Sequence, residues 1–309
     1  MVAYLLARLG GGAVSVALLL VVVHGLVAAA PGDPLVALLG PGILGLPEAQ
    51  RERMRIEAGL DRPWPQQAAA YLGAVLRGDL GTSRRSGRPV ADELRDRLPA
   101  TVALAAAALT LALALGLIVG VAAAAFARSW LDPLLTGALL LGAAVPVYWT
   151  GLLLLYAFSL ALGWLPASGG GGWRHLLLPA LSLGLASAAP LARVTRAALL
   201  DALAAPHVVA ARARGLSRPS VLLRHGLRNA LAPVVTVAAI DLGRMLGGVV
   251  FVEAVFGWPG LGHLAVDAIL ARDLALVQGI VLVTAVAVLV LGLLVDLTYL
   301  RLDPRVRHR

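Results

Sequence analysis

Residues 206–235 read PHVVAARARGLSRPSVLLRHGLRNALAPVV, a polar and arginine-rich stretch with a hydrophobic segment directly on each side. Against a single acid, Asp201, seven arginines lie in or next to it: Arg193, Arg196, Arg212, Arg214, Arg218, Arg224 and Arg228. Short loops with such an excess of basic residues stay in the cytoplasm under the positive-inside rule. The stretch therefore predicts a cytoplasmic loop between two membrane spans.

The order of residues within this loop predicts two short helices joined by a tight turn. Residues 208–214 suit a first helix, and Gly215 follows as the residue that commonly ends a helix in the left-handed conformation. Ser217 is suited to capping a second helix, with Pro219 in its first turn. Two short helices around a glycine, which we expect to allow a close approach of the backbone, would form a compact element at the inner face of the membrane.

The loop resembles the EAA coupling loop of ABC-importer permeases, in the form carried by dipeptide and oligopeptide permeases. The matching residues are Ala210, Ala211, the GLS at 215–217, His225, the LRNA at 227–230 and Pro233. The resemblance implies contact with an ATPase subunit through Ala210, Ala211, Arg212, Arg214, Gly215, His225 and Asn229, with small alanines against the ATPase and arginines pairing with its acids. Val209 occupies the position of the glutamate in the loop's name. The alternative is a basic loop that only sets the topology.

Composition places the chain among polytopic membrane proteins. Of its 309 residues 60% are hydrophobic, and the mean hydropathy is +0.87. The net charge of +9 comes from arginine, because the chain contains no lysine. Without lysine there can be no P-loop, and without cysteine no disulfide, thiolate metal site or cysteine nucleophile. We expect no catalytic residue, metal or cofactor in this chain, and any ATP and Mg²⁺ to be used by a partner subunit.

Six hydrophobic segments predict an all-α fold with six transmembrane helices. They cover residues 9–30, 101–127, 134–162 with a kink at Pro146, 176–193, 230–256 and 279–300. An even number places both termini on one side, and the basic loop and the arginine-rich C-terminal tail put that side in the cytoplasm. We expect the first segment to be retained rather than cleaved, because its apolar core is longer than that of a signal peptide.

Residues 31–98 are too polar to span a membrane and are expected to lie outside. Amphipathic patterns predict helices near 47–58, closed by Gly59, and near 65–77. The strings PGDP (31–34), LDRP (60–63), GDLGTS (78–83), GRPV (87–90) and GWLPASG (163–169) resemble outer regions of dipeptide-type permeases. The resemblance implies an N-terminal helix over 1–30, an extracytoplasmic region over 31–98, and a type I ABC-importer transmembrane domain over 99–305 with its coupling loop at 199–229.

The resemblance implies a permease subunit of an ATP-driven importer that translocates di- or oligopeptides across the cytoplasmic membrane of a bacterium or archaeon. It implies a heterodimer with a second permease subunit, two ATPase subunits, an extracytoplasmic substrate-binding protein, membrane lipid and no nucleic acid. Family members carry peptides, glutathione, opines or nickel, so the substrate stays open. An ion-coupled secondary transporter would show paired repeats with broken helices, and an intramembrane enzyme would need a set such as HExxH or a Ser-Lys dyad. The sequence shows neither pattern.

Asp241 and Arg244 form an ionisable pair inside the predicted fifth span. Because they are three residues apart, they share a helix face and can neutralise each other, which matters where each charge costs about 2.5–3.5 kcal/mol. Either the pair lines the translocation path and meets a zwitterionic substrate, or it neutralises itself and faces a partner subunit. If the two charges neutralise each other, replacing Asp241 alone would leave a buried cation. We interpret Glu253 and Asp296 as structural and His24 as an interhelical hydrogen-bonding residue rather than a metal ligand.

Overall fold

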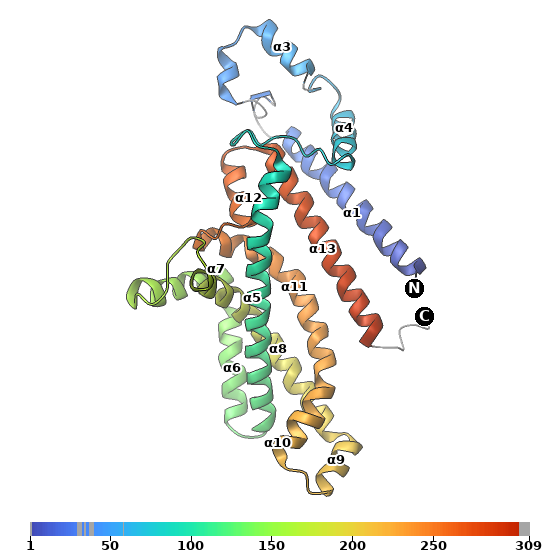
Figure 1. The fold of residues 1–309 in the computed structure, drawn as a ribbon, viewed down its shortest axis with the longest axis vertical. Coiled ribbons are helices and arrows are strands. Elements are labelled where there is room, and N and C mark those ends of the chain that lie inside the picture. The colour runs from blue at the N-terminus through green and yellow to red at the C-terminus, as the bar shows by residue number, and fades with distance from the viewer. Residues whose placement is uncertain (1, 30–32, 34, 37–39, 58, 303–309) are drawn as a thin grey trace. The chain divides into compact units, whose positions relative to one another are not determined.

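The computed structural model describes residues 2–29, 33, 35–36, 40–57 and 59–302, and within them every extended regular element is a helix (Figure 1). The only strand-like pairing in these residues is one antiparallel bridge between Thr82 and Pro89. The predicted all-α fold is therefore confirmed.

Among the described residues, five helical segments are long and apolar enough to cross a membrane. They belong to α1 (Val2–Ala29), α5 (Val90–Ala125), α8 (Trp173–Ala204), α11 (Arg228–Phe256) together with the turns before it, and α13 (Leu274–Leu302). A sixth candidate is the pair formed by α6 (Leu131–Ala144) and by α7 (Val147–Leu154) with η2 (Leu155–Ala161), which is bent by 101°. By length and composition, the predicted six spans are reached when this bent pair counts as one.

The predicted third span is not a single kinked helix. Val145 and Pro146 both leave the helical conformation, with ψ of 130° and 139°, and the chain changes direction between α6 and α7. Proline has no N–H to donate and disfavours the helical conformation at the residue before it. The proline thus separates two helices, where the sequence predicted only a kink.

Two helices also extend well past their hydrophobic segments. Helix α5 begins at Val90 and carries Asp92 and Glu93 in its first turn, where carboxylates interact favourably with the helix dipole. Helix α8 continues to Ala204, although hydropathy predicts an end at Arg193. Hydropathy marks the part of a helix that lipid can cover, so polar helical ends escape it.

The chain divides into two compact units, and the one formed by residues 100–259 with 294–302 is built around α8 and α11. In this unit α8 packs against α11, α6 and α7, and Leu104, Leu191 and Val252 are fully buried in the shared core. At Gly120 of α5, an added Cβ would lie 2.7 Å from the Ala192 carbonyl oxygen of α8. Such close contacts through small residues are typical of helix packing in membranes.

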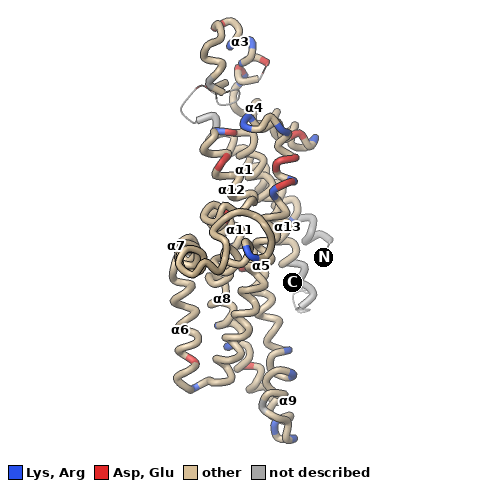
Figure 2. The backbone as a smooth tube through the Cα atoms, turned by 60° about the vertical axis from the view of Figure 1, so that its left-hand side comes forward, with Lys and Arg blue, Asp and Glu red and all other residues tan. Residues whose placement is uncertain are grey.

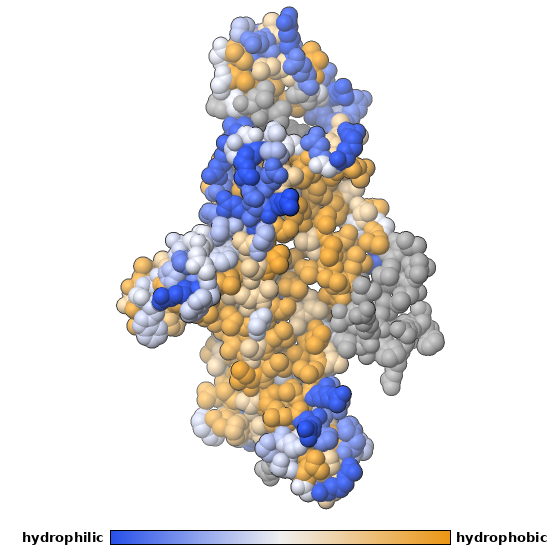
Figure 3. All heavy atoms as spheres, in the orientation of Figure 1, coloured by the Kyte–Doolittle hydropathy of each residue, from blue (hydrophilic) through white to orange (hydrophobic). Residues whose placement is uncertain are grey.

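The surface of this unit is hydrophobic along its helices, while hydrophilic residues gather where α9 and α10 lie (Figure 3). The backbone view shows the same separation, with basic residues near α9 and few charges along α6 (Figure 2). Lipid can cover the first region and water the second, as a membrane protein requires.

The other unit comprises the described residues up to 99 and residues 260–293. It contains α1, η1 (Pro41–Gly45), α3 (Glu48–Glu57), α4 (Trp64–Leu76) and α12 (Leu261–Leu270), together with parts of α5 and α13. The two amphipathic helices predicted near 47–58 and 65–77 are confirmed as α3 and α4. Gly59 ends α3 with a φ of +68°, as predicted.

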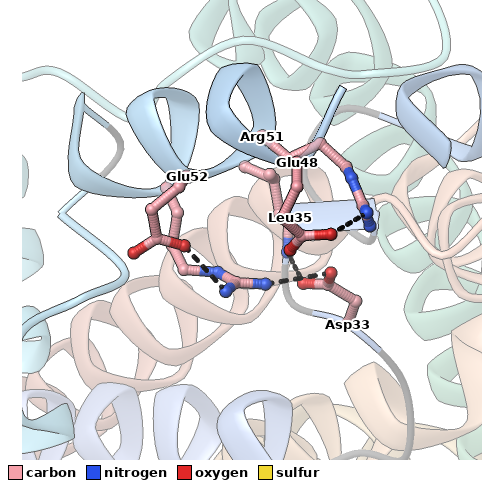
Figure 4. A network of polar contacts seen from close by, with 6 residues as sticks. Asp33, Leu35, Glu48, Arg51 and Glu52 are labelled. Carbon is pink, nitrogen blue, oxygen red and sulfur yellow. Dashed lines mark hydrogen bonds and ion pairs between the residues drawn. The ribbon is translucent and has the colours of Figure 1, made fainter. Parts of the chain in front are cut away.

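Polar side chains organise this second unit. Asp33 accepts hydrogen bonds from the Leu35 N–H at 2.9 Å and from Arg55 at 3.1 Å (Figure 4). Asp273 is 1% exposed and accepts the Ser83 hydroxyl at 2.6 Å, which fixes the GDLGTS segment. These contacts hold the short polar segments in place beside an apolar cluster that includes Val90, Leu94 and Leu276.

His24 lies between helices, as the sequence predicted. Its Nδ1 is 3.2 Å from the Gln278 side-chain amide of α13, and its ring stacks on Tyr71 of α4 with centroids 5.9 Å apart. Burial raises the pKa of Tyr71 to about 12, so its phenol stays protonated at physiological pH.

Candidate functional site

The predicted coupling loop is a helical element that joins α8 to α11. After Ala204, residue Ala205 is extended (φ −65°, ψ 141°) and turns the chain into α9 (Pro206–Ala213). Pro206 is at the first helical position, where its missing N–H leaves no hydrogen bond unmade. After the turn, α10 (Arg218–Ser220) and the π-helical η3 (Val221–Leu227) run directly into α11. The second short helix is therefore the beginning of the fifth span rather than a separate helix.

Gly215 makes the turn between the two helical parts. Its φ is +84°, which confirms the predicted left-handed conformation. The Gly215 N–H donates to the Arg212 carbonyl at 3.0 Å, and the Leu216 N–H donates to the Ala211 carbonyl at 3.4 Å. This pair of bonds is the Schellman arrangement that ends helices. An added Cβ at Gly215 would meet no atom within 4 Å, so the predicted close backbone approach is not found in this chain.

One face of helix α9 is buried against the rest of the chain, and the opposite face is exposed on the surface of the subunit. Val208 and Ala211 are 0% and 3% exposed, and α9 contacts α8 and η3. Ala210, Arg212 and Arg214 are exposed. Ala211 was expected to lie against an ATPase subunit, and this is wrong for the conformation observed, because the helix phase turns its side chain inward.

Apolar contacts fix the loop to the ends of the neighbouring helices. A buried cluster of Ala124, Leu199 and Ala230 is surrounded by further leucines of α8 and η3. Gly226 lies directly against α8, since an added Cβ would be 2.7 Å from Leu199 Cδ1. A displacement of α9 or η3 would therefore pass to α8 and α11.

Two predicted site residues hold the loop together. The Asn229 side-chain amide donates to the His225 carbonyl at 3.0 Å and lies 3.3 Å from His207 Nε2 of α9. Asn229 thus connects the first turn of α11 to α9. His225 takes part through its backbone carbonyl rather than through its imidazole.

The exposed surface of the loop combines apolar and basic side chains. Val209, Leu216 and Leu223 are 52%, 37% and 54% exposed. Exposed arginines also belong to this surface: Arg212, Arg214 and Arg224. Sequence reasoning stressed the charges and missed the apolar residues; Val209 at the usual glutamate position was the available signal. We call these six residues the loop surface.

An ion pair near the same end of α8 was also missed. Arg196 binds Asp132 in the first turn of α6 through two hydrogen bonds of 2.6 and 2.5 Å. Bidentate pairs of this kind fix orientation as well as distance. Arg196 was predicted as a topology-setting loop arginine, but it lies within α8 and joins that helix to α6.

Asp241 and Arg244 pair as predicted, with Arg244 Nη1 donating to Asp241 Oδ1 at 3.0 Å. Their exposure is strongly unequal, because the Asp241 side chain is 4% exposed and the Arg244 side chain 75%. The expectation that Arg244 is buried is therefore wrong for the isolated subunit. The buried member of the pair is the Asp241 carboxylate. The arginine points out of the subunit.

Glu253 is fully buried and accepts a hydrogen bond of 2.7 Å from the Thr101 hydroxyl. Nearby, Trp258 Nε1 donates to the Ala100 carbonyl at 2.9 Å. The first bond joins α5 to the end of α11 and the second joins α5 to the residues just after it, in agreement with a structural role for Glu253. The side chain of Asp296 lies outside the described residues.

Comparison with known proteins identifies a family and several relatives that this chain resembles. Residues 112–308 match the family described as binding-protein-dependent transport system inner membrane component. The glutathione transport system permease protein GsiC of Escherichia coli O6:H1 is 39% identical over 310 residues, and GsiC of Salmonella paratyphi A is 38% identical over 312, each covering 100% of both chains.

Solved structures show the same fold at lower identity. An inward-facing MetNI methionine ABC transporter matches with a TM-score of 0.58 and 18% identity, covering 68% of this chain and 96% of that chain. An amino acid ABC transporter matches with a TM-score of 0.51 and 18% identity, covering 68% and 94%.

The apolar helices, with a basic helical loop between two of them, are those expected of a transport permease. The relatives matched over the full length and the shared fold indicate the same family. The chain belongs to the binding-protein-dependent transport system inner membrane components and is a permease of an ABC importer.

Proposed function

We propose that this permease translocates small peptides, glutathione among them, across the cytoplasmic membrane. The observation that carries the proposal is the match of 38–39% identity over the whole length to glutathione transport permeases. This full-length match includes residues 1–111, which lie outside the family match and contain the region expected to be extracytoplasmic. Four of the five dipeptide-type strings of the sequence, among them GDLGTS at 78–83, lie before residue 112.

The import machine on this proposal contains a second permease subunit, two ATPase subunits and an extracytoplasmic substrate-binding protein. ATP and Mg²⁺ are bound by the ATPase subunits, and this chain supplies the path. Both termini and the α9–α10 loop lie in the cytoplasm, because the loop carries the excess of arginine.

The loop surface is the proposed contact with an ATPase subunit. Its exposed apolar residues can be buried in a cleft, while its arginines meet acids around the edge. Helix α9 packs on α8 and η3 through its buried face, and the apolar cluster behind the loop joins η3 to α8 and to the start of α11. Motion of the ATPase would therefore reach the membrane-spanning helices through packed side chains. Val209, in the place of the usual glutamate, makes this part of the contact apolar.

Substrate competition tests the proposed cargo. Cells that depend on this permease for uptake of radiolabelled glutathione are challenged with unlabelled trialanine, unlabelled glutathione or Ni²⁺. We expect both peptides to compete and Ni²⁺ to have no effect. Labelled Ni²⁺ uptake that requires the permease, without peptide uptake, would show that the chain serves a metal importer.

A further inference from the structure

Within α11, the Asp241–Arg244 pair places an exposed positive charge on a helix that is expected to cross the membrane. Arg244 lies 16 residues after Arg228 and 12 before Phe256, which places it about 24 and 18 Å from the helix ends at 1.5 Å per residue. It is therefore well inside this candidate span, about 18 Å or more from either end. A guanidinium turned towards lipid at this depth costs about 2.5–3.5 kcal/mol on insertion scales. The face that carries Arg244 is better matched to a wet or protein-lined path than to lipid.

The surface beside Arg244 is open. Gly243 and Gly247 flank the arginine, and an added Cβ at either position would meet no atom within 4 Å. Ile240, one helical turn earlier, is 52% exposed. The guanidinium therefore stands on a face with room for another group to approach it.

Asp241 holds the arginine without using all of its donors. A guanidinium has five N–H groups, and one hydrogen bond to Asp241 Oδ1 is formed in the described part of the chain. The other carboxylate oxygen, Oδ2, is buried and has no hydrogen-bond partner among the described residues. Arg244 is thus fixed by the buried carboxylate and keeps donors for a second, exposed acceptor.

The charge balance favours a transient acceptor over a permanent one. Because Asp241 already neutralises Arg244, a fixed acid on a partner subunit would leave the site with a net negative charge in the membrane. A peptide brings both a carboxylate and an ammonium group, so its passage does not leave a lasting imbalance. Weak, exchangeable binding also suits a solute that must leave again.

We infer that Arg244 binds the carboxylate of the transported peptide during its passage and that Asp241 positions it. This inference rests on the proposed function, and it adds a contact within the permease that favours substrates with a free carboxylate.

The test uses the complete importer in proteoliposomes, with radiolabelled glutathione and trialanine as probes. The decisive variant is Asp241→Asn/Arg244→Gln, which removes both charges and leaves no unpaired ion. We expect it to assemble with the partner subunits, keep ATP hydrolysis stimulated by the loaded binding protein, and lose uptake about tenfold or more, as expected for loss of hydrogen bonds to a charged group. Asp241→Asn alone, which keeps the arginine, should retain more uptake than the double variant.

A matched control removes an ion pair of the same chemistry elsewhere. Arg88 and Asp96 form an exposed pair at 2.8 Å, and Arg88→Gln/Asp96→Asn should leave uptake within about twofold. Normal uptake by the Asp241→Asn/Arg244→Gln variant would overturn the inference, since the pair would then only neutralise itself. Loss of the second permease from that complex would overturn it too and mark the face as a subunit interface. A wild-type complex that imports neither probe would overturn the proposed function together with this inference.

Discussion

Replacing Gly215 with valine tests whether the shape of the loop carries coupling. Gly215 has a φ of +84°, which a β-branched residue adopts only under strain. A non-glycine residue in the left-handed region costs about 1–3 kcal/mol. Since an added Cβ would meet no atom within 4 Å, this cost comes from the backbone and not from a clash.

The strain shifts the equilibrium between the native turn at residue 215 and other conformations of the loop. A cost of about 1–3 kcal/mol lowers the population of the native turn about 5- to 150-fold relative to competing loop conformations. The Schellman bonds that end α9 would open first, because they depend on the conformation of Gly215. The membrane-spanning helices do not depend on this turn, so insertion should be unchanged.

The assay is co-purification of the ATPase subunits together with substrate-stimulated ATP hydrolysis in reconstituted complexes. We expect Gly215→Val to weaken both, and Gly215→Asn to keep most of each, since asparagine tolerates the left-handed conformation. Ala210→Trp, at an exposed position of α9, should block docking by size alone. Equal stimulated hydrolysis and uptake in all variants would show that the loop does not couple the ATPase to transport and only sets the topology.

Other predictions concern topology, packing and ionisation. A tag inserted after Ser86 should be open to protease in intact cells, whereas one inserted after Arg214 should be protected; the opposite result would reverse the topology. Asp132→Asn and Arg196→Gln should each lower the thermal stability of the purified subunit, and the double variant should be less destabilised than the sum of both, unless the pair contributes nothing. Absorbance titration should show one phenol ionising near pH 12, and Tyr71→Phe should remove that step; its persistence in the variant would assign it to another tyrosine.

Local sequence signals predicted local structure well. Gly215 is left-handed because glycine in that position after a helical segment has few alternatives. The spacing of Asp241 and Arg244 was sufficient to predict their ion pair, since a helix places residues three apart on one face. Hydropathy identified the apolar part of the spans, because each span must by itself supply enough consecutive apolar residues to cross the bilayer.

Features that depend on packing between distant segments were missed. Which of Asp241 and Arg244 is buried depends on how α11 rotates against its neighbours, and spacing alone does not contain that rotation. Ala211 turned inward because α9 packs on α8 and η3. The Arg196–Asp132 bond joins residues 64 apart in the sequence, and no local pattern links them.

The energy source for import distinguishes an ABC importer from an ion-coupled transporter. Proteoliposomes carrying this chain with its second permease and ATPase subunits are supplied with loaded binding protein on the outer side and ATP on the cytoplasmic side. We predict accumulation of labelled glutathione or trialanine that requires ATP hydrolysis and the binding protein, and that persists when ion gradients are collapsed. Accumulation driven by a proton or sodium gradient without ATP would contradict it.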